Sequence, residues 1–211
     1  MIIHCSGEEL VLCKERAVYW KRERMLIISD LHLGKAAHFR ESGIQVPSTV
    51  GLTDLQNLSK LLKKYTTDTL LITGDMFHNY MNSDVLDFKQ WRNSHSALKI
   101  VLVKGNHDGL TKADYDDLKI EVYDHELIIA PFRFMHDRPE MNDQYYTFSG
   151  HIHPGITIHG RARQRIRLAC FCISENSAVL PAFSVFTGLS MIQPEDTDCI
   201  YAITPTGVVK V

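Results

Sequence analysis

The stretch Met25-Leu-Ile-Ile-Ser-Asp-Leu-His32 contains an apolar run that ends at a carboxylate and an imidazole. A short apolar run bounded by charged residues is typical of a buried strand. Two more runs of this kind follow, Thr69–Thr73 before Gly74-Asp75 and Lys99–Val103 before Gly105-Asn106-His107. The repeated pattern predicts three core strands, each followed at once by polar side chains that can carry chemistry.

Amphipathic helices are predicted between these strands, because apolar residues recur there at spacings of three and four. Leu52, Leu55, Leu58, Leu62 and Tyr65 mark the first helix, and Val85, Phe88 and Trp91 mark the second. We expect no helix of useful length beyond Asp117. Further strands are expected within Ile2–Trp20 and at Glu121–Val122, Glu126–Ala130, Tyr145–Phe148, Arg165–Ile173, Ala182–Phe186, Ile200–Thr204 and Val208–Val211.

This order of elements predicts an α/β (α+β) fold in which two sheets pack together with helices outside. The strand–helix units come first, and the second half is rich in strands. At 211 residues the chain is long enough for one well-buried domain. No repeat or linker-like stretch divides it, so we expect a single domain over residues 1–211.

The composition excludes several classes of protein. The formal net charge is -2, so an anionic partner must be held by a local patch or a metal. No apolar run approaches the roughly 20 residues of a membrane span, and residues 1–9 do not resemble a signal peptide. Five cysteines without framework spacing, Cys170 and Cys172 among them, predict reduced thiols in a cytoplasmic protein.

Asp, Asn and His residues gather where strands are predicted to end. They are Asp30, His32, Asp75, Asn106, His107, His136, His151 and His153. Ligands of an open α/β sheet bind beyond the carboxyl ends of its strands, so these side chains are expected at one edge. Two divalent cations need a bridging carboxylate with imidazole and amide ligands around it. A nitrogen and oxygen donor set without thiolate suits Mn, Fe, Zn or Co.

The ordered motifs Asp30-Leu-His32, Gly74-Asp75, Gly105-Asn106-His107-Asp108, a single His136, and Gly150-His151-Ile-His153 resemble the calcineurin-like metallophosphoesterase superfamily. The resemblance implies a four-layer α-β-β-α sandwich of two mixed sheets. It also implies that Asp30, His32, Asp75 and His153 bind one metal, while Asp75, as the bridge, binds the second with Asn106, His136 and His151. His107 would be the general acid. We expect Asp108 to support the loop or orient a neighbouring histidine.

A narrower resemblance covers nearly the whole chain. The segment Asp30-Leu-His-Leu-Gly-Lys35, the segment Gly74-Asp-Met-Phe-His78 and the tract Gly160–Arg167 are similar to the ligase-associated DNA damage response endonuclease family. This resemblance implies a phosphodiesterase or nuclease that cleaves DNA in repair, with manganese as the expected metal. It also implies DNA ligase and helicase as possible partners.

Several cations are candidate substrate contacts: Lys35, Arg40, His78, Arg161, Arg163, Arg165 and Arg167. The four arginines of the tract stand at every second position, so an uninterrupted strand would place them on one face. The alternative is a solvated edge whose charges discourage aggregation. His4, His38, His95, His125 and His159 are expected to lie outside the site.

Two other functions compete with the nuclease. A small-molecule phosphoesterase acting on nucleotides or similar esters would use the same metal ligands. A non-catalytic protein-binding scaffold on the same fold is disfavoured, because all the ligand positions are retained. The segment after Gly74-Asp75 lacks the Asp-Arg-Gly of the protein phosphatases. The sequence does not determine endo- or exonuclease action, strand preference or oligomeric state.

Overall fold

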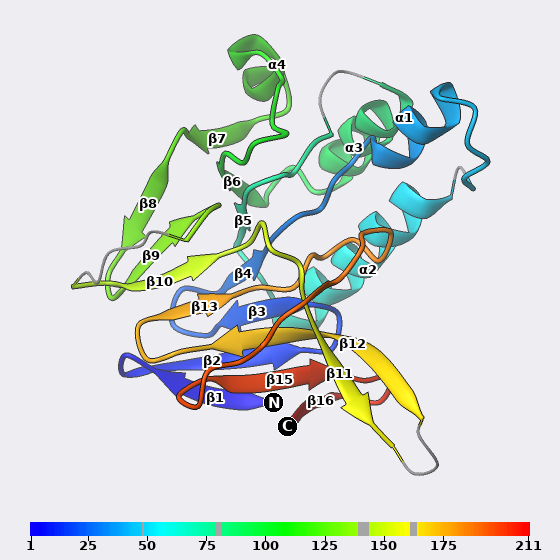
Figure 1. Cartoon of the computed structure of the whole chain (residues 1–211). Coiled ribbons are helices and arrows are strands. Elements are labelled where there is room, and N and C mark those ends of the chain that lie inside the picture. The colour runs from blue at the N-terminus through cyan, green and yellow to red at the C-terminus, as the bar shows by residue number, and fades with distance from the viewer. Residues whose placement is uncertain (48, 79–81, 139–143, 161–163) are drawn as a thin grey trace.

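A computed structural model describes residues 1–47, 49–78, 82–138, 144–160 and 164–211, and Figure 1 shows their arrangement as two packed sheets with helices. The first sheet has seven strands in chain order. They are β1 (Ile2–Cys5), β2 (Glu8–Cys13), β3 (Ala17–Trp20), β4 (Met25–Ile28), β5 (Thr69–Thr73), β6 (Lys99–Val103) and β7 (Ile120–Tyr123). Strands β1 to β4 are antiparallel neighbours, whereas β4 to β7 are parallel. The sheet is therefore mixed.

The second sheet has nine strands within the described residues, and it is also mixed. They are β8 (Glu126–Ile129), β9 (Phe132–Met135), β10 (Tyr146–Ser149), β11 (Pro154–His159), β12 (Arg165–Ile173), β13 (Ser177–Val179), β14 (Ser190–Met191), β15 (Cys199–Ile203) and β16 (Val208–Lys210). Strands β9, β10 and β13 are parallel and form its centre. The antiparallel hairpin β11–β12 projects from the sheet at the lower right of Figure 1.

The helices are α1 (Lys35–Glu41), α2 (Val50–Tyr65), α3 (Ser83–Ser94) and α4 (Lys112–Asp117). Helix α2 buries Leu55, Leu58 and Leu62 as its spacing predicts, but Leu52 is 41% exposed and Leu61 is buried in addition. Leu52 stands in the first turn of the helix and does not belong to the apolar core that Leu55, Leu58, Leu61 and Leu62 join. Helices α3 and α4 begin at side-chain caps, Asn82 and Thr111, which accept hydrogen bonds from first-turn N–H groups.

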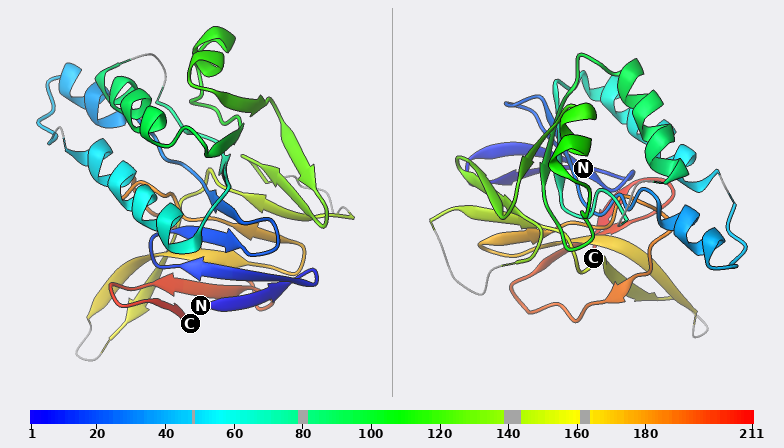
Figure 2. Two further views of the ribbon diagram at one scale, coloured as in Figure 1. Left: turned by 180° about the vertical axis from the view of Figure 1, so that it is seen from behind. Right: turned by 90° about the horizontal axis from the view of Figure 1, so that it is seen from above.

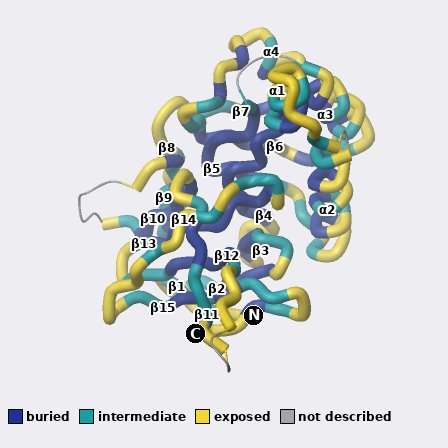
Figure 3. The backbone as a smooth tube through the Cα atoms, turned by 45° about the vertical axis from the view of Figure 1, so that its right-hand side comes forward, coloured by how far each residue is buried: buried dark blue, intermediate teal, exposed yellow. Residues whose placement is uncertain are grey.

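Two apolar cores separate the layers. One lies between the first sheet and α2, α3 and α4, with Leu58, Phe88 and Ile72 among its members. The other lies between the two sheets and includes Trp20 and Phe148. Figure 3 shows the central strands β5 and β6 as buried, and Figure 2 shows the helices gathered on the outer side of the first sheet.

The mixed α/β class and the packing of two mixed sheets are thus confirmed. Among the described residues no helix lies outside the second sheet, so one of the two expected helix layers is absent there. Cys170, Cys172, Val179 and Ile200 form a small third cluster on that side, against which Ile192 of the segment after β14 packs. A non-helical segment covers this face because the residues after β13 are turns and short bridges.

The prediction of a strand at Ala182–Phe186 is wrong. Ala182 makes only an isolated bridge to Ser29, and the chain then turns. Its carbonyl groups are already satisfied, because the Arg16 guanidinium donates to the oxygens of Ala182 and Ser184 at 3.2 and 2.9 Å. The short elements α4, β9, β11, β13 and β14 were not predicted as a helix or as strands. No helix of the described residues is both long and apolar enough to cross a membrane.

Candidate metal centre

The candidate ligands meet because strand ends from both sheets converge. Register pairs Ile28 with Ile72 and Ile72 with Leu102, so β4, β5 and β6 end at one edge and release Asp30, Asp75 and Asn106 there. In the second sheet, β9 and β10 are parallel and lead to His136 and His151 at the same end. The Gly150 N–H donates to the His136 carbonyl at 3.0 Å, which keeps these two turns together.

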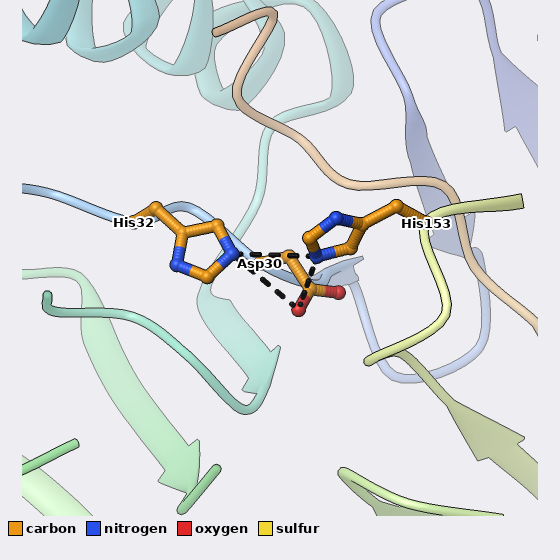
Figure 4. A group of neighbouring side chains, drawn as sticks. All are labelled: Asp30, His32 and His153. Atoms are coloured by element: carbon orange, nitrogen blue, oxygen red, sulfur yellow. Dashed lines mark hydrogen bonds and ion pairs between the residues drawn. The ribbon is translucent and has the colours of Figure 1, made fainter. Parts of the chain in front are cut away.

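A first triad consists of Asp30, His32 and His153, drawn in Figure 4. The Asp30 Oδ1 atom lies 3.1 Å from His153 Nε2 and 3.9 Å from His32 Nε2. The two imidazole nitrogens are 3.3 Å apart. Burial lowers the pKa of His32 to about 4, although Asp30 and Asp75 act in the opposite direction. His32 is therefore neutral at pH 7, the form in which an imidazole binds a metal.

A second triad consists of Asp75, His136 and His151. The His136 Nε2 atom lies 3.3 Å from Asp75 Oδ2 and 3.1 Å from His151 Nδ1. On its other side, His136 Nδ1 lies 3.0 Å from the carbonyl oxygen of Thr73. A proton on Nδ1 donated to that carbonyl leaves Nε2 as the ligand atom, which is the usual arrangement around a metal-binding histidine.

Asp75 and His136 are strongly coupled. Burial lowers the pKa of His136, but the hydrogen bond and negative charge of Asp75 outweigh it and raise that pKa to about 9. Burial raises the pKa of Asp75, yet His136, the His107 N–H and His32 together hold it well below its ordinary value. A proton shared by this pair occupies the position that a cation would take, so metal binding here must release it.

The two triads are contiguous. His151 belongs to the second triad by its ring, while its backbone N–H donates to Asp30 Oδ2 of the first at 3.1 Å. The His32 N–H donates to the Asp75 carbonyl oxygen at 2.9 Å. One segment of each sheet thus contacts both triads, which is the arrangement that a binuclear site needs.

Backbone strain is concentrated on these residues. Asp30, His32, Asp75, His151 and His153 all have φ between 48° and 66°, the left-handed region that residues other than glycine rarely adopt. Such residues cost of order 1–3 kcal/mol each and persist where the surroundings fix them, often at functional sites. The strain supports a function for the cluster.

Two glycines allow the close approach. A Cβ atom at Gly150 would lie 1.7 Å from Ser29 Oγ and 2.5 Å from Asp30 Oδ2, so only glycine lets the two sheets meet here. Gly74 has φ +88° and faces the His136 ring, where a Cβ would lie 2.0 Å from Nδ1. Both positions therefore require glycine for steric reasons.

The donor set fits divalent cations. Asp30 Oδ1 is buried without a hydrogen-bond partner, although the ligand nitrogens of His32 and His153 converge on it. Three lone-pair atoms facing one another repel unless a proton or a cation lies among them. Nitrogen and oxygen donors from imidazole and carboxylate suit transition metals such as Mn, Fe, Zn or Co.

His107 lies beside the triads in a row of imidazoles. Its ring centroid is 5.7 Å from that of His32 and 5.0 Å from that of His78, with which it stacks. The backbone N–H of His107 donates to Asp75 Oδ1 at 2.9 Å. Asn106 precedes it in an exposed turn after β6. The roles of His107 as general acid and of Asn106 as metal ligand stay predictions.

Asp108 fastens this turn, as the sequence predicted. Its Oδ2 accepts a hydrogen bond from the Gly105 N–H and its Oδ1 accepts one from the Phe77 N–H, both at 2.9 Å. The side chain is buried and joins the turn carrying His107 to the loop carrying Asp75. Asp108 therefore acts as a positioning residue.

Two of the substrate-contact candidates lie at the site. Lys35, at the start of α1, is close enough to Asp30 and Asp75 to feel their charges, while burial lowers its pKa. His78 contacts His107, and burial lowers its pKa to about 4, with His107, His38 and Lys35 adding to the effect. His38 was expected outside the site, yet its ring centroid lies 5.2 Å from that of His78. The spacing of three between Lys35 and His38 was the signal that could have identified it.

The other candidates lie elsewhere. Arg40 forms an ion pair with Asp84 of α3 at 3.1 Å, so it joins α1 to α3. Arg165 and Arg167 lie exposed on β12, opposite His159 and Thr157 of β11. Arg161 and Arg163 lie outside the described residues. The described strand begins at Arg165, so a shared face is established for only two of the four arginines.

Comparisons with known proteins give the family. The model of the calcineurin-like phosphoesterase family matches residues 23–170. The solved structure of Pseudomonas putida nuclease MPE is 30% identical, with a TM-score of 0.86 over 100% of this chain and 99% of that one. Comparison with curated proteins finds no match.

Two further solved structures are less similar. A protein of unknown function, AQ665 from Aquifex aeolicus, is 22% identical over 65% of this chain and 80% of its own, with a TM-score of 0.43. The phosphoesterase Yfce from E. coli is 14% identical over 86% and 88%, with a TM-score of 0.45. The family assignment depends only on the match of the family model and on the full-length similarity to nuclease MPE. The chain therefore belongs to the calcineurin-like phosphoesterase family of metal-dependent hydrolases.

Proposed function

We propose that this protein is a two-metal nuclease that cleaves phosphodiester bonds of DNA and acts in DNA repair. The observation that carries the proposal is the pair of contiguous triads beside His107. The full-length similarity to nuclease MPE supports a nucleic-acid substrate. The narrower resemblance of the motifs suggests DNA repair, with DNA ligase and helicase as partners.

The residues have separate tasks in this proposal. Asp30, His32 and His153 hold one metal, His136, His151 and Asn106 hold the second, and Asp75 bridges them. Manganese is the proposed metal, and metals at this site would supply positive charge to a phosphate and lower the pKa of water. His107 is placed to donate a proton to the leaving oxygen, and its hydrogen bond to Asp75 fixes the turn that carries it.

The hairpin β11–β12 offers a surface for the DNA backbone. Arg165 and Arg167 pair with residues six and four positions beyond His153, so they lie roughly 20 and 14 Å from it along the strand at about 3.4 Å per residue. That distance corresponds to about four to six nucleotides of one strand. A protein of net charge -2 needs such a local patch to bind DNA.

The test replaces Arg165 and Arg167 together by Gln. If both contact phosphates, the slope of log K against log salt should fall by about 1.8 on duplex DNA or 1.4 on single strands. The matched control replaces Lys63 and Lys64 together by Gln; both are exposed cations in the last turn of α2. That turn leads into the opposite end of β5, so the control should leave the slope unchanged.

A substrate panel with Mn²⁺ separates the nuclease from the alternatives. It should contain single- and double-stranded DNA, RNA, cyclic nucleotides and phosphomonoesters. Efficient cleavage of small esters with no activity on DNA would favour the small-molecule phosphoesterase. A protein that binds no metal would instead be a scaffold. We also propose a cytoplasmic location, which agrees with the absence of disulfides among the five cysteines.

A further inference from the structure

Three side chains form a group next to His107 and to His32, whose ring centroid lies 6.2 Å from that of His78. The His78 ring stacks on His107 with 5.0 Å between centroids, and the His38 ring follows at 5.2 Å from His78. Lys35 stands three residues before His38 on α1, so both project from the same face of that helix. The three residues come from two segments, α1 and the loop after β5.

Packing does not account for this group. His38 is exposed, and within the described part of the chain its ring makes no hydrogen bond. His78 Nδ1 is buried without a hydrogen-bond partner, which is costly unless a ligand or water supplies one. Lys35 is half-buried and makes no ion pair with another residue of the described part of the chain. Three nitrogen-bearing side chains with spare hydrogen-bonding capacity therefore face one region.

The chemistry of the group suits an anion. An ammonium group donates three hydrogen bonds and carries a positive charge, and each imidazole can donate at least one. A phosphate offers several acceptor oxygens, and hydrogen bonds between charged partners are the strong ones.

The position of the group relates it to the reaction. His107 marks the leaving-group side of the site, and His38 lies at most two ring steps, of 5.0 and 5.2 Å, beyond it. Neighbouring phosphates of a strand are separated by at least about 3.4 Å along its axis. A phosphate next to the scissile one can therefore reach His38 while the scissile phosphate lies beside His107.

We propose that Lys35, His38 and His78 bind the phosphate next to the scissile one on the leaving-group side. This subsite rests on the proposed nuclease function and adds to it. It selects nucleotide chains over esters that contain a single phosphate. His38 is then a specificity-determining residue.

The experiment compares three substrates for the Mn²⁺-loaded enzyme. The reference is the thymidine dinucleotide with one phosphodiester, and the other two carry an additional phosphate at the 5′ or the 3′ end. We measure kcat/KM for cleavage of the diester in each. One terminal phosphate should raise kcat/KM by about 10-fold, the effect of one charge-assisted hydrogen bond, and the other should have little effect.

His38→Ala should remove most of that 10-fold advantage and lower kcat/KM for the reference dinucleotide much less. Alanine is a good helix former and His38 is exposed, so α1 should persist. The matched control is His125→Ala, an exposed histidine between β7 and β8, which should keep the full advantage.

Two results would overturn the subsite. One is a wild-type enzyme for which neither terminal phosphate helps, and the other is a His38→Ala enzyme that loses the same factor on all three substrates. Failure of the nuclease function is recognised separately. In that case the wild-type enzyme hydrolyses bis(p-nitrophenyl) phosphate but cleaves no dinucleotide or oligonucleotide, and the subsite proposal falls with it.

Discussion

Replacing Asp108 tests how the metal centre is held together. Its two carboxylate oxygens accept hydrogen bonds at 2.9 Å from the N–H groups of Gly105 and Phe77. Asp108→Ala would leave two backbone donors without an acceptor, and each buried donor costs about 1–3 kcal/mol. The expected loss of unfolding free energy is therefore roughly 2–6 kcal/mol. Asp108→Asn keeps one acceptor oxygen, so it should lose about half as much.

The assay is urea unfolding of the metal-free protein at pH 8. Burial raises the pKa of Asp108 to about 6, so the carboxylate is ionised under these conditions. The control is Asp124→Ala, which removes an exposed ion pair with Lys104 and should leave the unfolding free energy nearly unchanged. Two results would refute the role of the Asp108 hydrogen bonds. One is an equal loss of unfolding free energy for Asp108→Ala and Asp108→Asn, and the other is a loss below about 1 kcal/mol for Asp108→Ala.

Three further predictions concern single residues. His107→Asn should keep both metals but slow hydrolysis by roughly 10²–10⁴-fold, and by less for nitrophenyl esters; an equal loss on good and poor leaving groups would contradict a general acid. Gly150→Ala should displace Ser29 and weaken metal binding by the first triad, since the new Cβ would lie 1.7 Å from Ser29 Oγ; unchanged metal affinity would contradict the close contact. Burial raises the pKa of Asp54 from 3.8 to about 6, against hydrogen bonds from Ser184 and Val185 and the charge of Arg16. Because the folded protein binds the Asp54 proton more tightly than the unfolded chain, protonation of Asp54 stabilises the fold. This stabilisation is fully present below pH 3.8 and is lost as pH rises through 6, by up to roughly 3 kcal/mol. Asp54→Asn should remove this dependence in thermal melts, whereas the exposed Asp116→Asn should retain it.

The sequence predicted the elements that carry strong periodicity. The three core strands and the helices around Leu58 and Phe88 form as expected, because one face of each is buried in a core. The segment Ala182–Phe186 is as apolar as a strand, but its backbone groups bond to Arg16, Ser29 and Asp30 instead of a neighbouring strand. Such side-chain and loop contacts are tertiary and leave no local pattern.

In the candidate site as well, residues marked by a local sequence pattern were predicted, whereas contacts between distant segments were not. Asp30, Asp75, His136, His151 and His153 were predicted from their positions after strands, and the structure brings them into two triads. The place of His38 could not be predicted with them, because it depends on how α1 lies against the loop that carries His78. The ion pair of Arg40 with Asp84 could not be predicted either, since Asp84 is distant in sequence.

The central claim is a binuclear centre in which Asp75 contributes to both metals. Calorimetric titration of the metal-free protein with Mn²⁺, together with metal analysis after dialysis, counts the bound ions directly. The wild-type chain should bind two, His153→Ala should weaken one site, and Asp75→Ala should weaken both. One ion per wild-type chain, or an Asp75→Ala protein that still binds two ions with unchanged affinity, would contradict the account.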